Sequence, residues 1–194
     1  GLVAAPPDLR LRAGELQACF EKLRPAGYFF AGAPALMPVM REVVGSAPTV
    51  RRWVQFQQER DGLLPGATWV KDFTAGIKVA YLVGALLGRV RRARARVGRR
   101  DGALVIFTTG STGSPKAALL SHEGILAQNV ALTVGFGLKD DDRLLVNLPP
   151  SHVGCTTELL GTAVYQGSTA VLLQLFDAGK RIVVIGSGAT AVTL

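Results

Sequence analysis

Five consecutive apolar residues, Ala103 to Phe107, lead directly into a loop made of threonine, glycine and serine. The run is rich in β-branched and aromatic side chains, which predicts a strand buried on both faces of a sheet. On the other side of the loop, Ala117 to Leu120 predicts a second short strand. Ser121 follows as a plausible helix N-cap and predicts a helix that runs to about Val134.

The loop between these two strands has residue types that suit a polyphosphate. Glycines let the backbone come close to a ligand and leave N–H groups unobstructed. Threonine and serine add hydroxyl donors, and lysine adds a positive charge. The spacing is not that of a Walker A loop. The candidate phosphate-binding residues are Thr108, Thr109, Gly110, Ser111, Thr112, Gly113 and Lys116. A surface turn without a ligand is the alternative interpretation.

Strands and helices alternate along the rest of the chain. Further strands are expected at residues 28–31, 53–56, 143–147 and 169–175, and further helices before Pro25 and at residues 34–44 and 158–165. The first of these helices places Leu16, Cys19, Phe20 and Leu23 on one face. Residues 57–68 are expected to form a loop. This alternation predicts an α/β fold with a mostly parallel sheet and flanking helices.

The positive charge of the chain is concentrated in one place. The net charge is +8, and seven arginines lie between Arg89 and Arg100. Without them, 15 basic residues would face 14 acidic ones. We interpret residues 89–102 as a solvated, arginine-rich linker. Binding to nucleic acid is disfavoured, because no aromatic residue lies between Tyr81 and Phe107 to stack on bases.

The cysteines and the apolar segments indicate a cytoplasmic protein. Cys19 and Cys155 offer neither a disulfide framework nor a metal-binding spacing, and no metal ligand is assigned. The longest apolar stretch, Val79–Leu87, is far shorter than the roughly 20 residues that a membrane span needs, so it predicts a buried or interfacial helix. No signal peptide is visible, and the missing initiator methionine suggests a truncated start.

The order of residues from Phe107 to Ala117 resembles the signature loop of the adenylate-forming (AMP-binding) superfamily, which includes acyl-CoA synthetases and luciferases. The family pattern is aromatic-Thr-Ser-Gly-Thr/Ser-Thr-Gly-x-Pro-Lys-Gly/Ala, and Thr109 replaces the usual serine while keeping the hydroxyl. Residues 148–154 and 161–176 are similar to the segments that follow this loop in the family. The resemblance covers residues 1–178. It implies a fragment of the large N-terminal domain of an adenylate-forming enzyme.

This resemblance implies ATP-dependent activation of a carboxylic (fatty) acid, first to an acyl-adenylate and then to an acyl-CoA, with ATP, Mg²⁺ and coenzyme A. Residues Thr108 to Lys116 would hold the β- and γ-phosphates. His152 would line the acyl pocket or steer the carboxylate, and a purely structural role is the alternative. The family's Tyr-Gly-x-Thr-Glu segment, its Thr-Gly-Asp segment and its C-terminal lid are absent. We therefore expect the chain alone to be inactive.

Residues 179–194 depart from this family. A β-branched strand leads into Gly-x-Gly-x-x-Ala, with Gly186 at the turn and Gly188 where a pyrophosphate would approach. This segment resembles the NADPH-binding fingerprint of flavin-dependent (Baeyer–Villiger type) monooxygenases and predicts a truncated Rossmann-like strand, turn and helix start. NADP binding is not expected, because the chain ends before the ribose-binding residue. The alternative functions are an oxidoreductase fragment and a non-enzymatic basic binding module centred on Arg89–Arg100.

Overall fold

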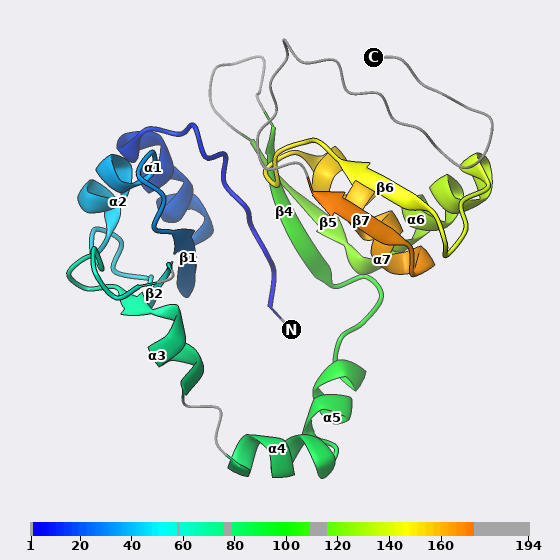
Figure 1. Cartoon of the computed structure of the whole chain (residues 1–194), viewed down its shortest axis with the longest axis horizontal. Coiled ribbons are helices and arrows are strands. Elements are labelled where there is room, and N and C mark those ends of the chain that lie inside the picture. The colour runs from blue at the N-terminus through cyan, green and yellow to red at the C-terminus, as the bar shows by residue number, and fades with distance from the viewer. Residues whose placement is uncertain (1, 58, 76–78, 109–115, 173–194) are drawn as a thin grey trace. The chain divides into compact units, whose positions relative to one another are not determined.

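The computed structural model of the chain describes residues 2–57, 59–75, 79–108 and 116–172 (Figure 1). It contains two compact units. Unit 1 comprises Gly1–Asp8 and Arg96–Leu194, and unit 2 comprises Leu9–Ala95. Both units combine helices with strands, as the alternation in the sequence predicts.

Unit 2 is built on a parallel three-stranded sheet. Its strands are β1 (Gly27–Ala31), β2 (Arg52–Phe56) and β3 (Thr68–Trp69), in the order β1-β2-β3. The helices are α1 (Ala13–Leu23), α2 (Met37–Val43), α3 (Val70–Ala75), α4 (Val79–Leu86) and α5 (Arg89–Ala95). The segment predicted as a solvated linker is thus exposed but helical over Arg89–Ala95.

The core of unit 2 forms between α1, α2 and the sheet. Leu16, Cys19 and Phe20 are buried on one face of α1, as their spacing predicts. Phe20 meets the rings of Tyr28 and Trp53 edge to face, with centroids 5.0 and 5.6 Å away. These edge-to-face ring contacts help to pack α1 on the sheet.

Strand β2 contains the strand predicted at residues 53–56, and its burial pattern does not alternate. Trp53, Val54 and Gln55 are consecutive and all buried, so both faces of the strand are covered at this point. Gln55 is 0% exposed, and both the nitrogen and the oxygen of its side-chain amide are hydrogen-bonded. Its Nε2 donates to Gln57 Oε1 at 2.6 Å and to the Gly62 carbonyl at 3.1 Å. Its Oε1 accepts from the Leu64 N–H at 3.0 Å, which fastens the loop after β2 to the strand.

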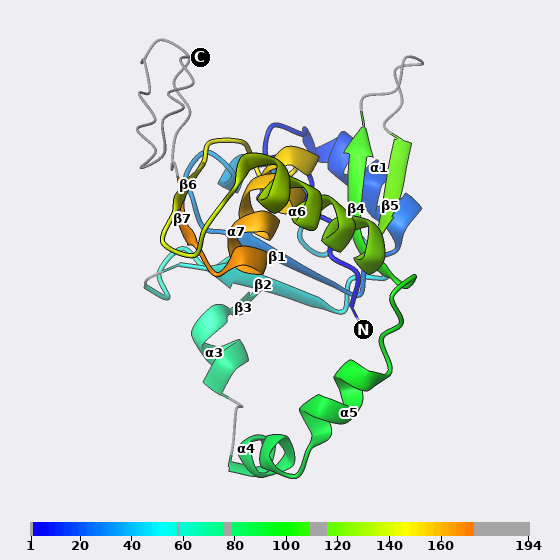
Figure 2. The same cartoon turned by 90° about the vertical axis from the view of Figure 1, so that its right-hand side faces the viewer.

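Unit 1 contains an antiparallel hairpin and a parallel pair of strands. The hairpin is formed by β4 (Gly102–Thr108) and β5 (Lys116–Ser121), which lie side by side in Figure 2. Strands β6 (Arg143–Val146) and β7 (Thr169–Leu172) pair in parallel. The helices of this unit are α6 (His122–Phe136), the π-helix η1 (Gly154–Leu159) and α7 (Leu160–Gln166). The connection from β6 to β7 through η1 and α7 is a β-α-β crossover.

The first residues of the chain join unit 1. Ala4 pairs in parallel with Leu104, with the Ala4 N–H donating to the Ala103 carbonyl at 3.0 Å. The Val105 N–H in turn donates to the Ala4 carbonyl at 2.7 Å. A segment at the start of the chain therefore lies along the outer edge of β4.

The predicted elements and the observed ones agree closely at α6. Ser121 caps this helix by accepting a hydrogen bond from the Gly124 N–H at 3.2 Å, and His122 begins it. The helix predicted at residues 158–165 starts earlier, at Gly154, as a π-helical turn. Strand β7 ends at Leu172 among the described residues, and its predicted extension to residue 175 lies outside them. Within the described parts of the chain, no helix is both long and apolar enough to cross a membrane.

Candidate functional site

Strand β4 supplies a rigid base for the candidate phosphate loop. Leu104, Val105 and Ile106 are all buried, as expected for a strand covered on both faces. At the far end of the hairpin Thr108 is paired with Lys116, so the two ends of the loop are held one strand spacing apart, about 5 Å. The candidates between them, Thr109, Gly110, Ser111, Thr112 and Gly113, lie outside the described residues.

The two described candidates of this loop present polar groups to solvent. Thr108 and Lys116 are both exposed, and the Thr108 hydroxyl donates to the Lys116 carbonyl at 3.4 Å. No carboxylate in the described part of the chain forms an ion pair with Lys116. An exposed ammonium group beside a hydroxyl can bind a phosphate oxygen through both charge and hydrogen bonding.

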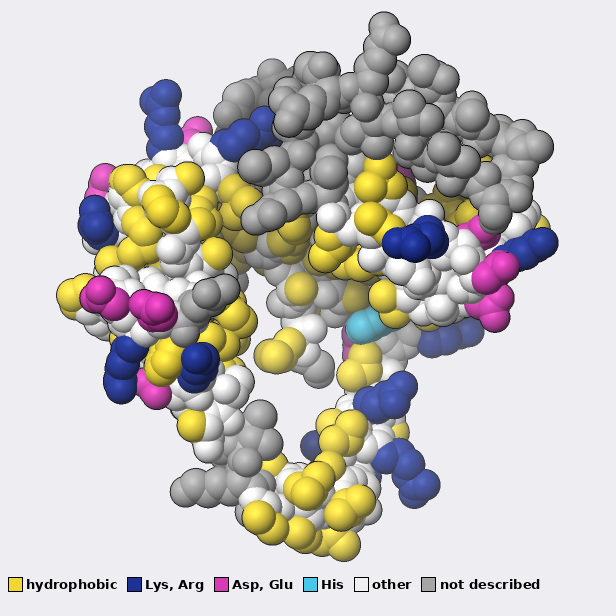
Figure 3. All heavy atoms as spheres, viewed as in Figure 1, with side chains coloured by type: hydrophobic (Ala, Val, Ile, Leu, Met, Phe, Trp, Pro, Cys, Tyr) yellow, Lys and Arg dark blue, Asp and Glu magenta, His cyan; other side chains and the backbone are white. Residues whose placement is uncertain are grey.

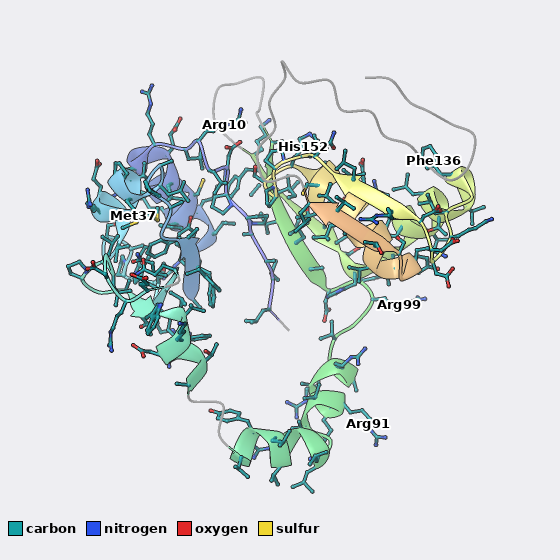
Figure 4. The ribbon with its side chains drawn as sticks, in the orientation of Figure 1. Arg10, Met37, Arg91, Arg99, Phe136 and His152 are labelled. Atoms are coloured by element: carbon teal, nitrogen blue, oxygen red, sulfur yellow. The ribbon has the colours of Figure 1, made fainter. Side chains whose placement is uncertain are left out.

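His152 lies in the turn after β6 (Figure 4). Its backbone N–H donates to the Pro149 carbonyl at 2.9 Å, and its carbonyl accepts from the Cys155 N–H at 3.0 Å. Its ring Nδ1 accepts from the Gly154 N–H at 3.0 Å. An accepting Nδ1 requires the neutral tautomer with its proton on Nε2. His152 is exposed, so it can use Nε2 as a donor to a ligand.

The turn that holds His152 depends on residues that the sequence analysis did not single out. Gly154 is buried, and a Cβ there would lie 2.9 Å from Leu148 Cδ1 and 3.1 Å from His152 Nδ1. A side chain at this position would therefore require Leu148 and the His152 ring to shift. Gln128 Nε2 donates to Glu158 Oε1 at 2.9 Å, which ties α6 to η1. The His-Val-Gly order could have indicated the contact between His152 and Gly154. No local pattern in the sequence indicates the hydrogen bond between Gln128 and Glu158.

The helix that follows His152 begins as a π-helix, Gly154–Leu159. Single π-helical turns are rare and occur often at functional sites. Here the turn is supported by buried polar side chains: Thr157 donates to the Val153 carbonyl at 2.8 Å, and Thr162 donates to Asn129 Oδ1 at 3.3 Å. The position of His152 is therefore set by a packed and hydrogen-bonded support.

The cysteines do not belong to a reactive site. Cys155, three residues after His152, is buried, and this desolvation raises the pKa of its thiol. Desolvation also raises the pKa of Cys19, while Lys22 opposes that shift. Both thiols are therefore protonated at neutral pH and are poor nucleophiles. Among the residues that the structure describes, no group of three or more His, Cys, Asp or Glu side chains could hold a metal ion.

The fold is that of the N-terminal domain of adenylate-forming enzymes, an α/β domain with parallel strands and flanking helices. The model of the family described as AMP-binding enzyme matches residues 1–190, and the chain belongs to this family.

Relatives with curated names are acyl-CoA synthetases and ligases. The acyl-CoA synthetase ALT10 of Alternaria alternata is 28% identical over 180 residues, which are 88% of this chain and 32% of that protein. The indoleacetate–CoA ligase of Aromatoleum aromaticum is 42% identical over 84 residues, which are 43% of this chain and 16% of that protein. The chain thus spans about a third of the length of the first relative.

Solved structures support the same fold. The inhibitor-bound N-terminal domain of FACL13 from Mycobacterium tuberculosis matches with a TM-score of 0.62 at 23% identity, over 91% of this chain and 39% of that chain. A fatty acyl CoA synthetase of Mycobacterium tuberculosis matches with a TM-score of 0.63 at 22% identity, over 91% of this chain and 30% of that one.

The comparisons do not bear out the resemblance of residues 179–194 to a flavin-dependent monooxygenase. The AMP-binding model instead continues to residue 190, past the expected boundary at residue 178. A strand followed by two closely spaced glycines is a short pattern that recurs at turns in α/β proteins, so it carries little family information by itself. Gly186 and Gly188 lie outside the described residues, and a cofactor role for them stays untested.

Proposed function

We propose that this chain carries the triphosphate-binding part of an enzyme that activates a carboxylic acid with ATP. The carboxylate attacks the α-phosphorus of ATP, pyrophosphate leaves, and the acyl-adenylate then reacts with the thiol of coenzyme A while AMP leaves. The observation that carries the proposal is the pairing of Thr108 with Lys116, which brackets the hydroxyl-rich loop inside a chain of the AMP-binding family.

In this proposal the two strand ends and the loop act together on the phosphates. Lys116 approaches the β- and γ-phosphates from β5, and Thr108 donates its hydroxyl from β4. Residues 109–113 contribute backbone N–H groups and further hydroxyls. Charge builds on the pyrophosphate as it leaves, so a fixed ammonium group stabilises the transition state more than the ground state.

Mg²⁺ and coenzyme A are what membership of the AMP-binding family implies for this reaction. Mg²⁺ would offset phosphate charge in such a reaction, held by one or two carboxylates together with the phosphates, and the described residues contain no group of three or more His, Cys, Asp or Glu side chains that could hold it without a nucleotide. His152 is proposed to orient the substrate carboxylate through Nε2, because Nδ1 is already engaged by the Gly154 N–H.

The 194-residue chain is not expected to complete the reaction alone. Its sequence has no Tyr-Gly-x-Thr-Glu segment for adenine and Mg²⁺ and no Thr-Gly-Asp segment for the ribose. Affinity for ATP should therefore be weak and should rest on the phosphates. Pyrophosphate exchange driven by any carboxylic acid in this chain alone would contradict this part of the proposal.

The decisive experiment is thermal unfolding of the chain with increasing ATP. ATP should raise the unfolding temperature, and Lys116→Ala should weaken this effect by about 10-fold to 100-fold in apparent affinity. Lys139→Ala, which removes an exposed lysine of the same unit, is the matched control. Stronger stabilisation by NADPH than by ATP would favour the oxidoreductase alternative. Steeply salt-dependent binding of nucleic acid would favour the basic binding module.

A further inference from the structure

Helix α4 exposes apolar side chains around most of its circumference, and its buried side, at Gly84, faces Arg89. Large hydrophobic residues cover the short segment from Val79 to Leu87, and Figure 3 shows hydrophobic side chains gathered over this helix. Their exposed fractions run from 44% to 79%, for Val79, Tyr81, Leu82, Val83, Leu86 and Leu87. Scattered exposed leucines are ordinary on a protein surface, but a contiguous apolar patch indicates a binding surface.

A helix with apolar side chains exposed over most of its surface needs an apolar environment, and a helix of this length is marginal in water on its own. Helix α4 has eight residues and is about 12 Å long at 1.5 Å per residue. The hydrocarbon core of a bilayer is about 30 Å thick. Such a helix therefore fits the plane of the membrane interface rather than a span across it.

Helix α5 follows at once and is strongly cationic. Its arginines, Arg89, Arg91, Arg92 and Arg94, are all exposed, and no acidic residue occurs between Asp72 and Asp101. Figure 3 shows their side chains beside the apolar surface of α4. A polybasic segment next to an apolar helix has the charge that anionic lipid headgroups attract, about 1 kcal/mol for each arginine near the surface.

The two helices form one compact pair. Gly88 makes the turn between them with φ of 79°. The Arg92 guanidinium donates to the Leu87 carbonyl at 3.0 Å. Gly84 is buried against Arg89, because a Cβ there would lie 2.9 Å from Arg89 Cδ. The apolar and the cationic surfaces are therefore held next to each other, not merely adjacent in sequence.

We propose that the α4–α5 pair docks this protein onto membranes that carry anionic lipid. Charge complementarity favours this occupant over a second copy of the chain, since the copy would bring the same arginines and repel. The pair joins an apolar surface to a cationic one, so the apolar side chains of α4 can enter the acyl boundary while the arginines of α5 stay among the headgroups. This inference does not depend on the proposed enzymatic function.

The test is flotation of the full chain with lipid vesicles. We expect binding to vesicles of phosphatidylcholine mixed with phosphatidylserine, little binding to phosphatidylcholine alone, and weaker binding at high salt. R91Q/R92Q/R94Q should lower partitioning about 100-fold, at about fivefold for each arginine. L82S/L86S should lower partitioning to a similar or greater extent, because it removes the inserted apolar surface.

Matched control variants test whether vesicle binding depends on α4 and α5 or only on the total charge and total exposed apolar surface of the protein. R41Q/R51Q/R52Q removes the same charge from exposed positions elsewhere in unit 2, and V134S/F136S removes exposed apolar groups from α6. Both should bind vesicles like the unaltered chain. All altered positions are exposed, and circular dichroism verifies that each variant is folded. The inference would be overturned by equal binding to neutral and anionic vesicles, or by no binding to either. It would also be overturned if test and control variants lost binding equally, or if the chain self-associated through α4 instead.

Discussion

Thr108 and Lys116 face each other across β4 and β5, and the Thr108 hydroxyl donates to the Lys116 backbone carbonyl at 3.4 Å. This bond is long and exposed, so it contributes little to folding. The hydroxyl can therefore turn toward an incoming phosphate at small cost. The pairing places a hydroxyl and an ammonium group at one end of a rigid hairpin, which is the geometric core of the proposed function.

Replacing Thr108 by valine should separate ligand binding from stability. Valine keeps the β-branched shape, so the free energy of unfolding should change by less than about 0.5 kcal/mol. The affinity for ATP, measured from the shift in unfolding temperature, should fall about fivefold because one neutral hydrogen bond is lost. Thr108→Ser keeps the hydroxyl and should bind ATP like the unaltered chain. Unchanged affinity in Thr108→Val would remove this residue from the site.

Replacing His152 should show how far its role is structural. His152→Ala removes the acceptor of the buried Gly154 N–H and should lower the free energy of unfolding by about 1 kcal/mol in urea titrations. His152→Asn should recover most of that loss, because an asparagine oxygen can accept from the N–H two residues ahead. Should the whole enzyme also lose carboxylate activation in His152→Asn, then Nε2 has the proposed second role. Equal stability of the alanine and asparagine variants would rule out the support that Nδ1 gives.

Replacing Gln55 by glutamate should destabilise unit 2 strongly. A carboxylate has no N–H or O–H to donate, so both hydrogen bonds from Gln55 Nε2, to Gln57 Oε1 and to the Gly62 carbonyl, would be lost. A carboxylate oxygen would instead face these two acceptor oxygens. We expect a loss of about 3–5 kcal/mol at pH 7, measured by urea unfolding. The loss should shrink at low pH, where the protonated carboxyl regains one donor. A loss that is the same at every pH would show that steric misfit, not the missing donor, is the cause.

The stability of the fold should fall at high pH because of Tyr28. Burial, with a smaller contribution from the nearby Cys19 thiol, raises the pKa of Tyr28 to about 12 from its usual value near 10. Below pH 10 the phenol is neutral in the folded and unfolded chains, and its contribution is fully present. Between pH 10 and 12 only the unfolded chain ionises, so stability falls by about 2–3 kcal/mol as pH rises.

Tyr28→Phe provides the comparison for this pH dependence, because phenylalanine keeps the ring and cannot ionise. Urea unfolding of both proteins between pH 9 and 12 should show a flatter profile for the variant, with the two curves differing most above pH 10. If the two profiles run parallel over this range, the Tyr28 phenol is not the group that responds.

The features that local patterns set were predictable from the sequence. The helical spacing of Leu16, Cys19 and Phe20 predicts that they are buried on one face of α1. The apolar run at residues 103–107 predicts the buried strand β4, and Ser121 predicts the start of α6. The residue order of the loop identified the family, because many fixed positions in one short stretch are rarely matched by chance.

The features that depend on distant contacts were not predictable. Gln55 is buried because Gly62 and Leu64 return to satisfy its amide, and no local pattern encodes that return. The density of charge in the arginine segment suggests a solvated linker, but alanine and arginine are strong helix formers, and Arg89–Ala95 forms helix α5. The π-helical start at Gly154 adds one residue to a turn, which helical periodicity cannot register.

The pairing of Ala4 with Leu104 has a consequence for how the chain is made. During synthesis Ala4 leaves the ribosome roughly 100 residues before its partner. Residues 9–95 form a continuous unit and can mature while the remainder is still being translated. Residues 1–8, in contrast, can pair only after β4 has been synthesised. Formation of the Ala4–Leu104 pair therefore occurs only once the second half of the chain is being made.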